Sequence, residues 1–225
     1  MAVAAESCFG WGETIVNGCG IRFTANITQT HTSRPITYQG SGTIDVPEGV
    51  RWMFMSNAFS CANAVVTKTG AGTWQAYDQM QDCVARLSGA RWIIHEGTMR
   101  ASGGDLFGGH TTIHNLIIEV HENGTFALNS AGHHLPVCAI VLRGGTMWGG
   151  YGQFQDTATW GIDGGAHWKG WGLNGPITVL PSLNGKPSRI VARASHLAHG
   201  NESRATIFDV QDGATLEVDT ALQPG

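Results

Sequence analysis

A short step of glycine, threonine and an apolar residue recurs along the chain and limits what it can fold into. The step appears as GTIDV, GTWQA, GTMRA, GTFAL and GTMWG, with a variant GATLEV, and starts at Gly42, Gly72, Gly97, Gly124, Gly145 and Gly213. The first five glycines lie 21 to 30 residues apart. Self-similarity at this kind of period is the sequence signature of solenoids and related repeat folds. We therefore expect a repeat architecture.

The residues around each step have the two-residue period of a β-strand. After the glycine, one set of side chains would point to one side, and these are Ile44/Val46, Trp74/Ala76, Met99/Ala101, Phe126/Leu128 and Leu216/Val218. The residues between them would point the other way, and these are Asp45, Gln75, Arg100, Ala127 and Glu217. A second strand precedes the later glycines, in RWIIHEG, LIIEVHENG, AIVLRGG and TIFDVQDG. Each unit is thus predicted to be a strand, a glycine turn and a strand.

One such coil cannot bury its own apolar side chains, but coils stacked at the strand spacing of ~4.8 Å form one continuous apolar column. The sequence therefore predicts an all-β protein, a parallel β-helix of about eight irregular coils. We expect residues 1–40 to form an N-terminal cap or attachment segment. Residues 41–225 would form the β-helix, with an insertion rich in aromatic residues and glycine at 148–175.

Composition excludes several classes of partner. Charged residues make up only 13 % of the chain, and the net charge is −4 with a pI near 6.2. Nothing in this balance favours nucleic acid or an anionic membrane surface. No run approaches the 18 apolar residues that a membrane span needs, and the N-terminus lacks the pattern of a secretory signal. We expect a chain without membrane insertion that is made in soluble form, or a fragment of a longer protein.

The five cysteines contain no Cys-x-x-Cys pair, which argues against a zinc ribbon or a thioredoxin-like motif. Cys61 and Cys83 are 22 residues apart, about one coil, so they would occupy equivalent positions on adjacent coils. A disulfide between them is one interpretation, and two buried thiols is the more ordinary one. Cys138 would then remain unpaired.

The segment 148–175 contains the strongest candidates for binding. Its aromatic side chains can stack on sugar rings or anchor a protein interface, or they can simply plug an open side of the coil stack. These candidate binding residues are Trp148, Tyr151, Trp160, Trp168 and Trp171.

Other chemistries are weakly supported. In KTGAG, Lys68 precedes the glycines and a strand follows, whereas a phosphate-binding loop needs the lysine after the glycines and then a helix. Several histidines lack further ligands at metal spacing, so surface positions are expected for His110, His114, His121, His133 and His134. Asp78, Asp82 and Glu119 are carboxylates, but nothing places two of them across a groove. We assign no catalytic residue, metal site or cofactor.

The residues TKTGAGTW (67–74), followed by HEGTMRAS and GGDLFG, resemble the autotransporter-associated β-strand repeat. Trp74 stands where that family usually has leucine, and the match covers about residues 65–150, with an echo at 205–220. The resemblance implies a right-handed β-helix of the kind found in the surface-exposed passenger regions of bacterial adhesins. Similar β-helices occur in the tail spikes and fibres of bacteriophages. The resemblance supplies no catalytic residues.

A starting Met without an export signal fits a virion protein and equally fits an excised fragment of a longer protein. We expect a non-enzymatic structural or adhesive protein of a bacteriophage virion, built into a tail spike, fibre or capsid decoration. It would form a homo-oligomer, contact other virion proteins and, as an open option, bind a cell-surface glycan. One alternative is a passenger fragment of an autotransporter adhesin at the bacterial cell surface. The other is a polysaccharide depolymerase.

Overall fold

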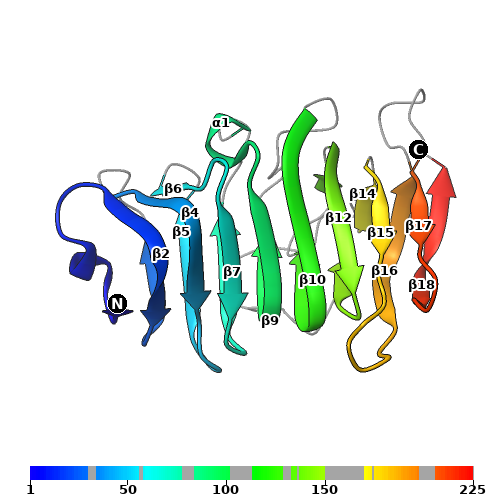
Figure 1. Ribbon diagram of the computed structural model, residues 1–225, viewed down its shortest axis with the longest axis horizontal. Helices are drawn as coiled ribbons and strands as arrows, with labels where there is room; N and C mark the ends of the chain where they lie inside the picture. The colour runs from blue at the N-terminus through cyan, green and yellow to red at the C-terminus, as the bar shows by residue number, and fades with distance from the viewer. Residues whose placement is uncertain are drawn as a thin grey trace, which may run out of the picture.

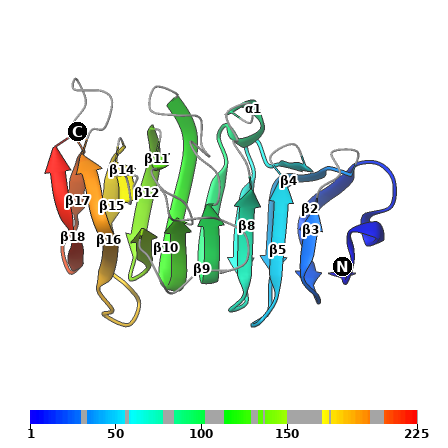
Figure 2. The ribbon, with the colours of Figure 1, turned by 180° about the vertical axis from the view of Figure 1, so that it is seen from behind.

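The fold is a stack of β-strand coils that progresses along the longest axis of the molecule, with the two termini at opposite ends (Figures 1 and 2). It is seen in a computed structural model. The structure describes residues 1–29, 34–55, 58–77, 84–101, 113–128, 133–135, 137–149, 170–173, 175–197 and 206–224. Among the described residues, no helix is long and apolar enough to cross a membrane.

Strands account for nearly all the regular structure. The first half contains β1 (Ala2–Val3), β2 (Thr14–Phe23), β3 (Ile27–Gln29), β4 (Ile36–Asp45), β5 (Arg51–Met55), β6 (Phe59–Ser60), β7 (Val65–Thr69), β8 (Thr73–Tyr77) and β9 (Arg91–Ala101). The second half contains β10 (Ile113–Leu128), β11 (His133–Leu135), β12 (Val137–Arg143), β13 (Thr146–Gly149), β14 (Gly170–Leu173), β15 (Ile177–Val179), β16 (Ser188–Leu197), β17 (Phe208–Val210) and β18 (Leu216–Pro224). The helical elements are the short η1 (Glu6–Phe9) and α1 (Val84–Leu87).

The strands pair in parallel and form ladders that run from coil to coil. Ladder 1 contains β1, β2, β4, β7, β9, β10, β12, β15 and β17. Ladder 2 contains β3, β5, β8, β9, β10, β13, β16 and β18. Further pairs on a third side join β2, β4 and β6, and join β11, β14, β16 and β18. The predicted class, an all-β parallel β-helix, is confirmed.

Glycines allow a long strand to leave one ladder and enter the next. β9 pairs with β7 before Gly97 and with β8 after it, and Gly97 has a φ of 72°. This left-handed conformation is cheap only for glycine. A Cβ on Gly97 would also lie 2.4 Å from the carbonyl oxygen of Gly70 on the preceding coil. At Gly72, Gly97, Gly124 and Gly145 the neighbouring coils therefore come too close for a side chain.

The interior is a continuous column of apolar side chains. In ladder 2, every residue of one inward column is buried from β3 to β16, namely Ile27, Trp52, Trp74, Met99, Phe126, Met147 and Ile190. Trp52 stacks on Phe23 with ring centroids 4.4 Å apart and on Trp74 with centroids 6.1 Å apart. Such aromatic pairs contribute ~0.5–1.5 kcal/mol beyond the burial of their area.

The inward pattern expected from the sequence is confirmed in the middle of the chain and fails at its last coil. Ile44, Trp74, Met99 and Phe126 are fully buried, but Val218, the next member of the ladder 2 column after Ile190, is 41 % exposed. β18 pairs only with β16 among the described strands, so no further coil covers its inward side chains there. Leu216 is partly buried and packs against the core.

Four further observations concern the expected layout. The outward side chains Gln75, Arg100 and Ala127 are also buried. The expected boundary at residue 41 is not a break in the ladders, because β2 pairs with β4 and both belong to the stack. The coil count differs somewhat from the eight expected, and the coils are irregular, since α1 lies before β9 where other coils have a strand. The end of the predicted insertion is also part of a coil, as β14 pairs with β11 and β16.

Candidate functional site

A cluster of charged side chains lies on the outer face of ladder 1. The outward column through its centre is mostly threonine and aliphatic, and Glu119 is the exception in the series Thr43, Thr67, Ile93, Glu119, Val141 and Thr178. The strand alternation of β10 explains the direction of Glu119, because its neighbours Ile118 and Val120 are fully buried in the interior.

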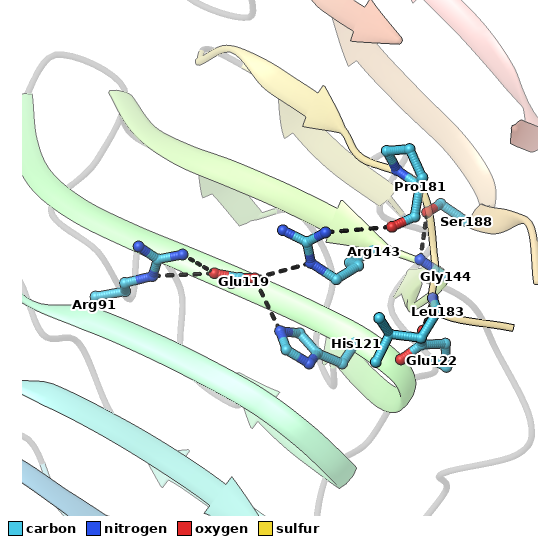
Figure 3. A network of polar contacts seen from close by, with 9 residues as sticks. All are labelled: Arg91, Glu119, His121, Glu122, Arg143, Gly144, Pro181, Leu183 and Ser188. Carbon is cyan, nitrogen blue, oxygen red and sulfur yellow. Dashed lines mark hydrogen bonds and ion pairs between the residues drawn. The ribbon is translucent and has the colours of Figure 1, made fainter. Parts of the chain in front are cut away.

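Parallel pairing brings basic side chains from adjacent strands to Glu119 (Figure 3). Arg91 of β9 donates from Nε to Glu119 Oε2 at 3.0 Å, and its Nη2 donates to the same oxygen. Arg143 of β12 donates from Nε to Oε1 at 3.4 Å. His121, two residues along β10 on the same face, has Nε2 at 2.9 Å from Oε1. The ring of His95 in β9 lies beside that of His121, with centroids 5.5 Å apart. We call Arg91, His95, His121 and Arg143 the cation cluster.

The cluster keeps Glu119 ionised although the residue is only 3 % exposed. The hydrogen bond from His121 lowers the pKa of Glu119 most, and Arg91 lowers it further by hydrogen bonding and charge. Burial acts in the opposite direction, and the resulting pKa is about 2. At neutral pH Glu119 therefore has no proton to donate, which does not suit the acid role in glycoside cleavage.

The loop between β15 and β16 is attached to the same region (Figure 3). Leu183 donates its backbone N–H to Glu122 Oε1 at 2.5 Å, and Lys186 Nζ donates to the carbonyl oxygen of Glu122. Arg143 donates from Nη1 to the carbonyl oxygen of Pro181 at 3.3 Å. The backbone N–H of Gly144 donates to Ser188 Oγ at 2.9 Å. The loop between β15 and β16 is thus held by hydrogen bonds beside the cation cluster, on the side of β12.

Lys68, the lysine of the KTGAG motif, lies inside the coil stack. It shares the inward face of β7 with Val66 and pairs with Ile44 and Ile94 on the adjacent coils. Its Nζ donates to the carbonyl oxygens of Thr69 at 3.0 Å and Glu96 at 2.9 Å, and also to that of Gly70. Burial is the main cause that lowers its pKa to about 8. The motif therefore joins the bends of two coils. Its two-residue spacing from Val66 was the one sequence signal for an inward lysine.

The predicted aromatic binding residues are only partly within the described chain. Trp148 lies in β13 and is half-buried, and Trp171 lies in β14. Tyr151, Trp160 and Trp168 lie outside the described residues. The aromatic binding surface thus remains a prediction.

Of the expected cysteine pair, the structure describes Cys61 alone. Cys61 is a fully buried free thiol whose Sγ accepts a hydrogen bond from Trp92 Nε1 at 3.1 Å. Burial raises the pKa of Cys61 to about 12, so the thiol is protonated and unreactive at neutral pH. Cys83 lies outside the described residues.

The remaining candidates from the sequence do not assemble into a second site within the described chain. His114 lies in β10, and His133 and His134 lie in β11, whereas His110, Asp78 and Asp82 are outside the described residues. Within the described parts, no three His, Cys, Asp or Glu side chains come together as metal ligands. Of the cation cluster and its carboxylate, the sequence singled out His121 and Glu119 but not Arg91, His95 and Arg143. Their spacing along the chain gives no local motif, because only the coil register brings them together.

The resemblance to the autotransporter-associated repeat depends on the sequence motif alone, and the structure supports the coarser class of parallel β-solenoid. Comparison with known protein families, with curated proteins and with solved structures finds no significant match.

Proposed function

We propose that this chain is a non-enzymatic structural or adhesive protein of a bacteriophage virion, in a tail spike, fibre or capsid decoration. The observation that carries the proposal is the parallel stack of coils with an uninterrupted buried column. Each coil contacts only its neighbours, so such a fold can present an extended outer surface without altering its core. This suits a protein whose task is to hold and display binding surfaces.

The chemistry of Glu119 supports the non-enzymatic part of the proposal. Two arginines and a histidine contact its carboxylate, and its low pKa makes it a poor proton donor. A glycan-cleaving site needs a carboxylic acid whose pKa is raised, with a second carboxylate at a defined distance. Glu119 instead serves to position the basic side chains around it.

The C-terminal coil supports the proposal of a partner within an assembly. Side chains at inward positions of this coil are exposed, at 46 % for Val210 and 41 % for Val218, and the nearby Ile207 is 58 % exposed. An open strand edge with apolar side chains is a surface that proteins normally cover. In the proposed function, another copy of the chain, another virion protein or further sequence of the same protein contacts this end.

The second candidate, a passenger segment of a bacterial adhesin, is favoured by the octapeptide TKTGAGTW. Lys68 and the glycines of this motif hold two coils together, so the motif marks a structural bend that adhesins and virion proteins can share.

The location of the chain separates the two candidates. Antibodies against the purified chain would be applied to density-purified phage particles and, separately, to intact bacterial cells that encode the chain. The proposal predicts immunogold label on the particles and the chain among particle proteins by mass spectrometry. Label on cells that release no particles would support the adhesin instead. Sustained release of reducing sugar from host polysaccharide would contradict a non-enzymatic role.

A further inference from the structure

We propose that the cation cluster binds the acidic groups of an anionic polysaccharide. This inference deepens the proposed function, on which it rests, by assigning the adhesive contact to one face of ladder 1 and one class of glycan. It depends on three observations, which are the charge of the cluster, the hydrogen-bond donors that its contacts with described residues leave over, and its position on the outer face of the coil stack.

The cluster has more positive charge than its own carboxylate neutralises. Two guanidinium groups, of Arg91 and Arg143, surround the single carboxylate of Glu119, and two imidazoles lie beside them. The chain as a whole has a net charge of −4. The cluster is thus a local positive site on an acidic protein, and one further anion would be attracted to it.

Donors remain available for such an anion. A guanidinium group carries five N–H donors. The contacts with described residues use Nε and Nη2 of Arg91, and Nε and Nη1 of Arg143. The side chains of Arg91 and Arg143 are 45 % and 29 % exposed. Glu119 lies nearly buried between them and fixes their orientation, so a ligand finds the guanidinium groups already positioned.

The arrangement suits a polysaccharide with separate acidic groups. Bidentate contacts from arginine recognise carboxylate, sulfate and phosphate oxygens. His95 is exposed and its ring lies near that of His121, so flat ring faces adjoin the guanidinium groups and can contact a sugar ring. Nucleic acid and anionic membranes call for a broad basic surface. Here Glu122 and the β15–β16 loop that it contacts lie beside the cluster, and the chain is acidic overall. A polysaccharide that carries isolated acidic groups on an otherwise uncharged backbone is therefore the better match.

The test uses dextran of one length in three forms: unmodified, carboxymethylated and sulfated. Binding of the full chain to each is measured by biolayer interferometry at low and physiological salt, with a DNA duplex and phosphatidylserine vesicles as competing polyanions. We expect the two acidic dextrans to bind and the unmodified dextran not to bind. The acidic dextrans should also bind more tightly than DNA or vesicles.

Matched variants locate the binding. Arg91→Gln should weaken binding of both acidic dextrans about tenfold, the usual effect of losing a charge-assisted hydrogen bond. Arg189→Gln is the control, because Arg189 is also 45 % exposed and also pairs with a glutamate, Glu217, but lies on ladder 2. Since Arg91 compensates Glu119, the double variant Arg91→Gln/Glu119→Gln leaves the net charge of the region unchanged and is used if the single variant unfolds. His95→Gln, at an exposed position, should weaken binding about threefold, and thermal melting should show that it is folded.

Three results would overturn the inference. They are absence of binding to both acidic dextrans, equal loss of binding in the Arg91 and Arg189 variants, and tighter binding of DNA or vesicles through the same residues. Other results would refute the proposed function, so the two proposals can be tested independently. A chain that is present in phage particles but has an inactive cluster would refute this inference alone. A chain that is absent from particles but binds acidic dextran through Arg91 would refute the virion assignment alone.

Discussion

A carboxylate on the outside of a coil can be as enclosed as a core residue when the neighbouring coils supply its partners. Glu119 shows this, because Arg91, His121 and Arg143 reach it from its own strand and the two adjacent strands. The alternation of β10 predicted that it points outward. Its enclosure was not predictable, since it depends on which residues the coil register places one strand away.

The low pKa of Glu119 predicts a loss of stability in acid. Its folded pKa is about 2, against 4.5 for the ordinary group. Its contribution is therefore complete above about pH 4.5 and disappears as the pH falls toward 2. We expect the wild type to lose about 2–3 kcal/mol of unfolding free energy across this window relative to Glu119→Gln. Urea unfolding at several pH values measures the difference, and parallel pH profiles of the two proteins would contradict it. Glu217→Gln, in an exposed pair, should change stability by less than about 1 kcal/mol.

Lys68 predicts a gain of stability in base. Burial lowers its folded pKa to about 8, against 10.5 for the ordinary group. Between these values the unfolded chain holds a proton that the folded chain has released, so stability rises with pH. The unfolding free energy of the wild type should increase relative to Lys68→Met from about pH 8 to 10.5. Lys186→Met, at an exposed loop position, should follow the wild type. If the unfolding free energies of the wild type and of Lys68→Met have parallel pH profiles, the ammonium group of Lys68 is not enclosed.

At the scale of the strand and its bend, the glycines were the most predictable feature. The repeated step identified Gly72 and Gly97 as bends from sequence alone, and the structure shows the crowding that requires them. The strands β2 and β3 lack this step. Their place in the stack became visible only in the pairing of β2 with β4.

Two glycines with the same backbone conformation separate crowding from conformational strain. Gly97 and Gly49 have φ values of 72° and 74°, but an added Cβ meets the oxygens of Gly70 and Gly72 at Gly97 and nothing within 4 Å at Gly49. Gly49→Ala should cost about 1–2 kcal/mol, the price of a left-handed conformation. Gly97→Ala should cost at least about 2 kcal/mol more, because the preceding coil must move. Chemical denaturation measures both, and equal costs would show that the bend is not crowded.

At the scale of the molecule, the apolar pattern predicted the class of fold but not the condition of the last coil. The sequence pattern of Leu216 and Val218 matches that of buried pairs such as Trp74 and Ala76. The difference is that no described strand follows β18 in its ladder. Burial at that position depends on what lies beyond it, which the local pattern does not contain.

The open coil predicts unequal effects for equal substitutions. Val179 and Val210 are paired neighbours in one inward column of ladder 1. Val179 is fully buried, whereas Val210 is 46 % exposed. Val179→Ala should lower the unfolding free energy by about 2 kcal/mol, and Val210→Ala by less than about 1 kcal/mol. Thermal and urea unfolding of the isolated chain provide the comparison. A large cost at Val210 would mean that this end is covered in solution.

Distances between spin labels test the coil stack most directly. Along the outward column of ladder 1, Thr67 and Thr178 are four coil steps apart, Thr43 and Thr178 five, and Thr43 and Asp209 six. With ~4.8 Å per step, pulsed electron resonance on labels at these pairs should give about 19, 24 and 29 Å. We predict that the distances increase by ~4.8 Å for each added coil step. Distances that do not follow the coil number would contradict the parallel stack on which the proposed functions depend.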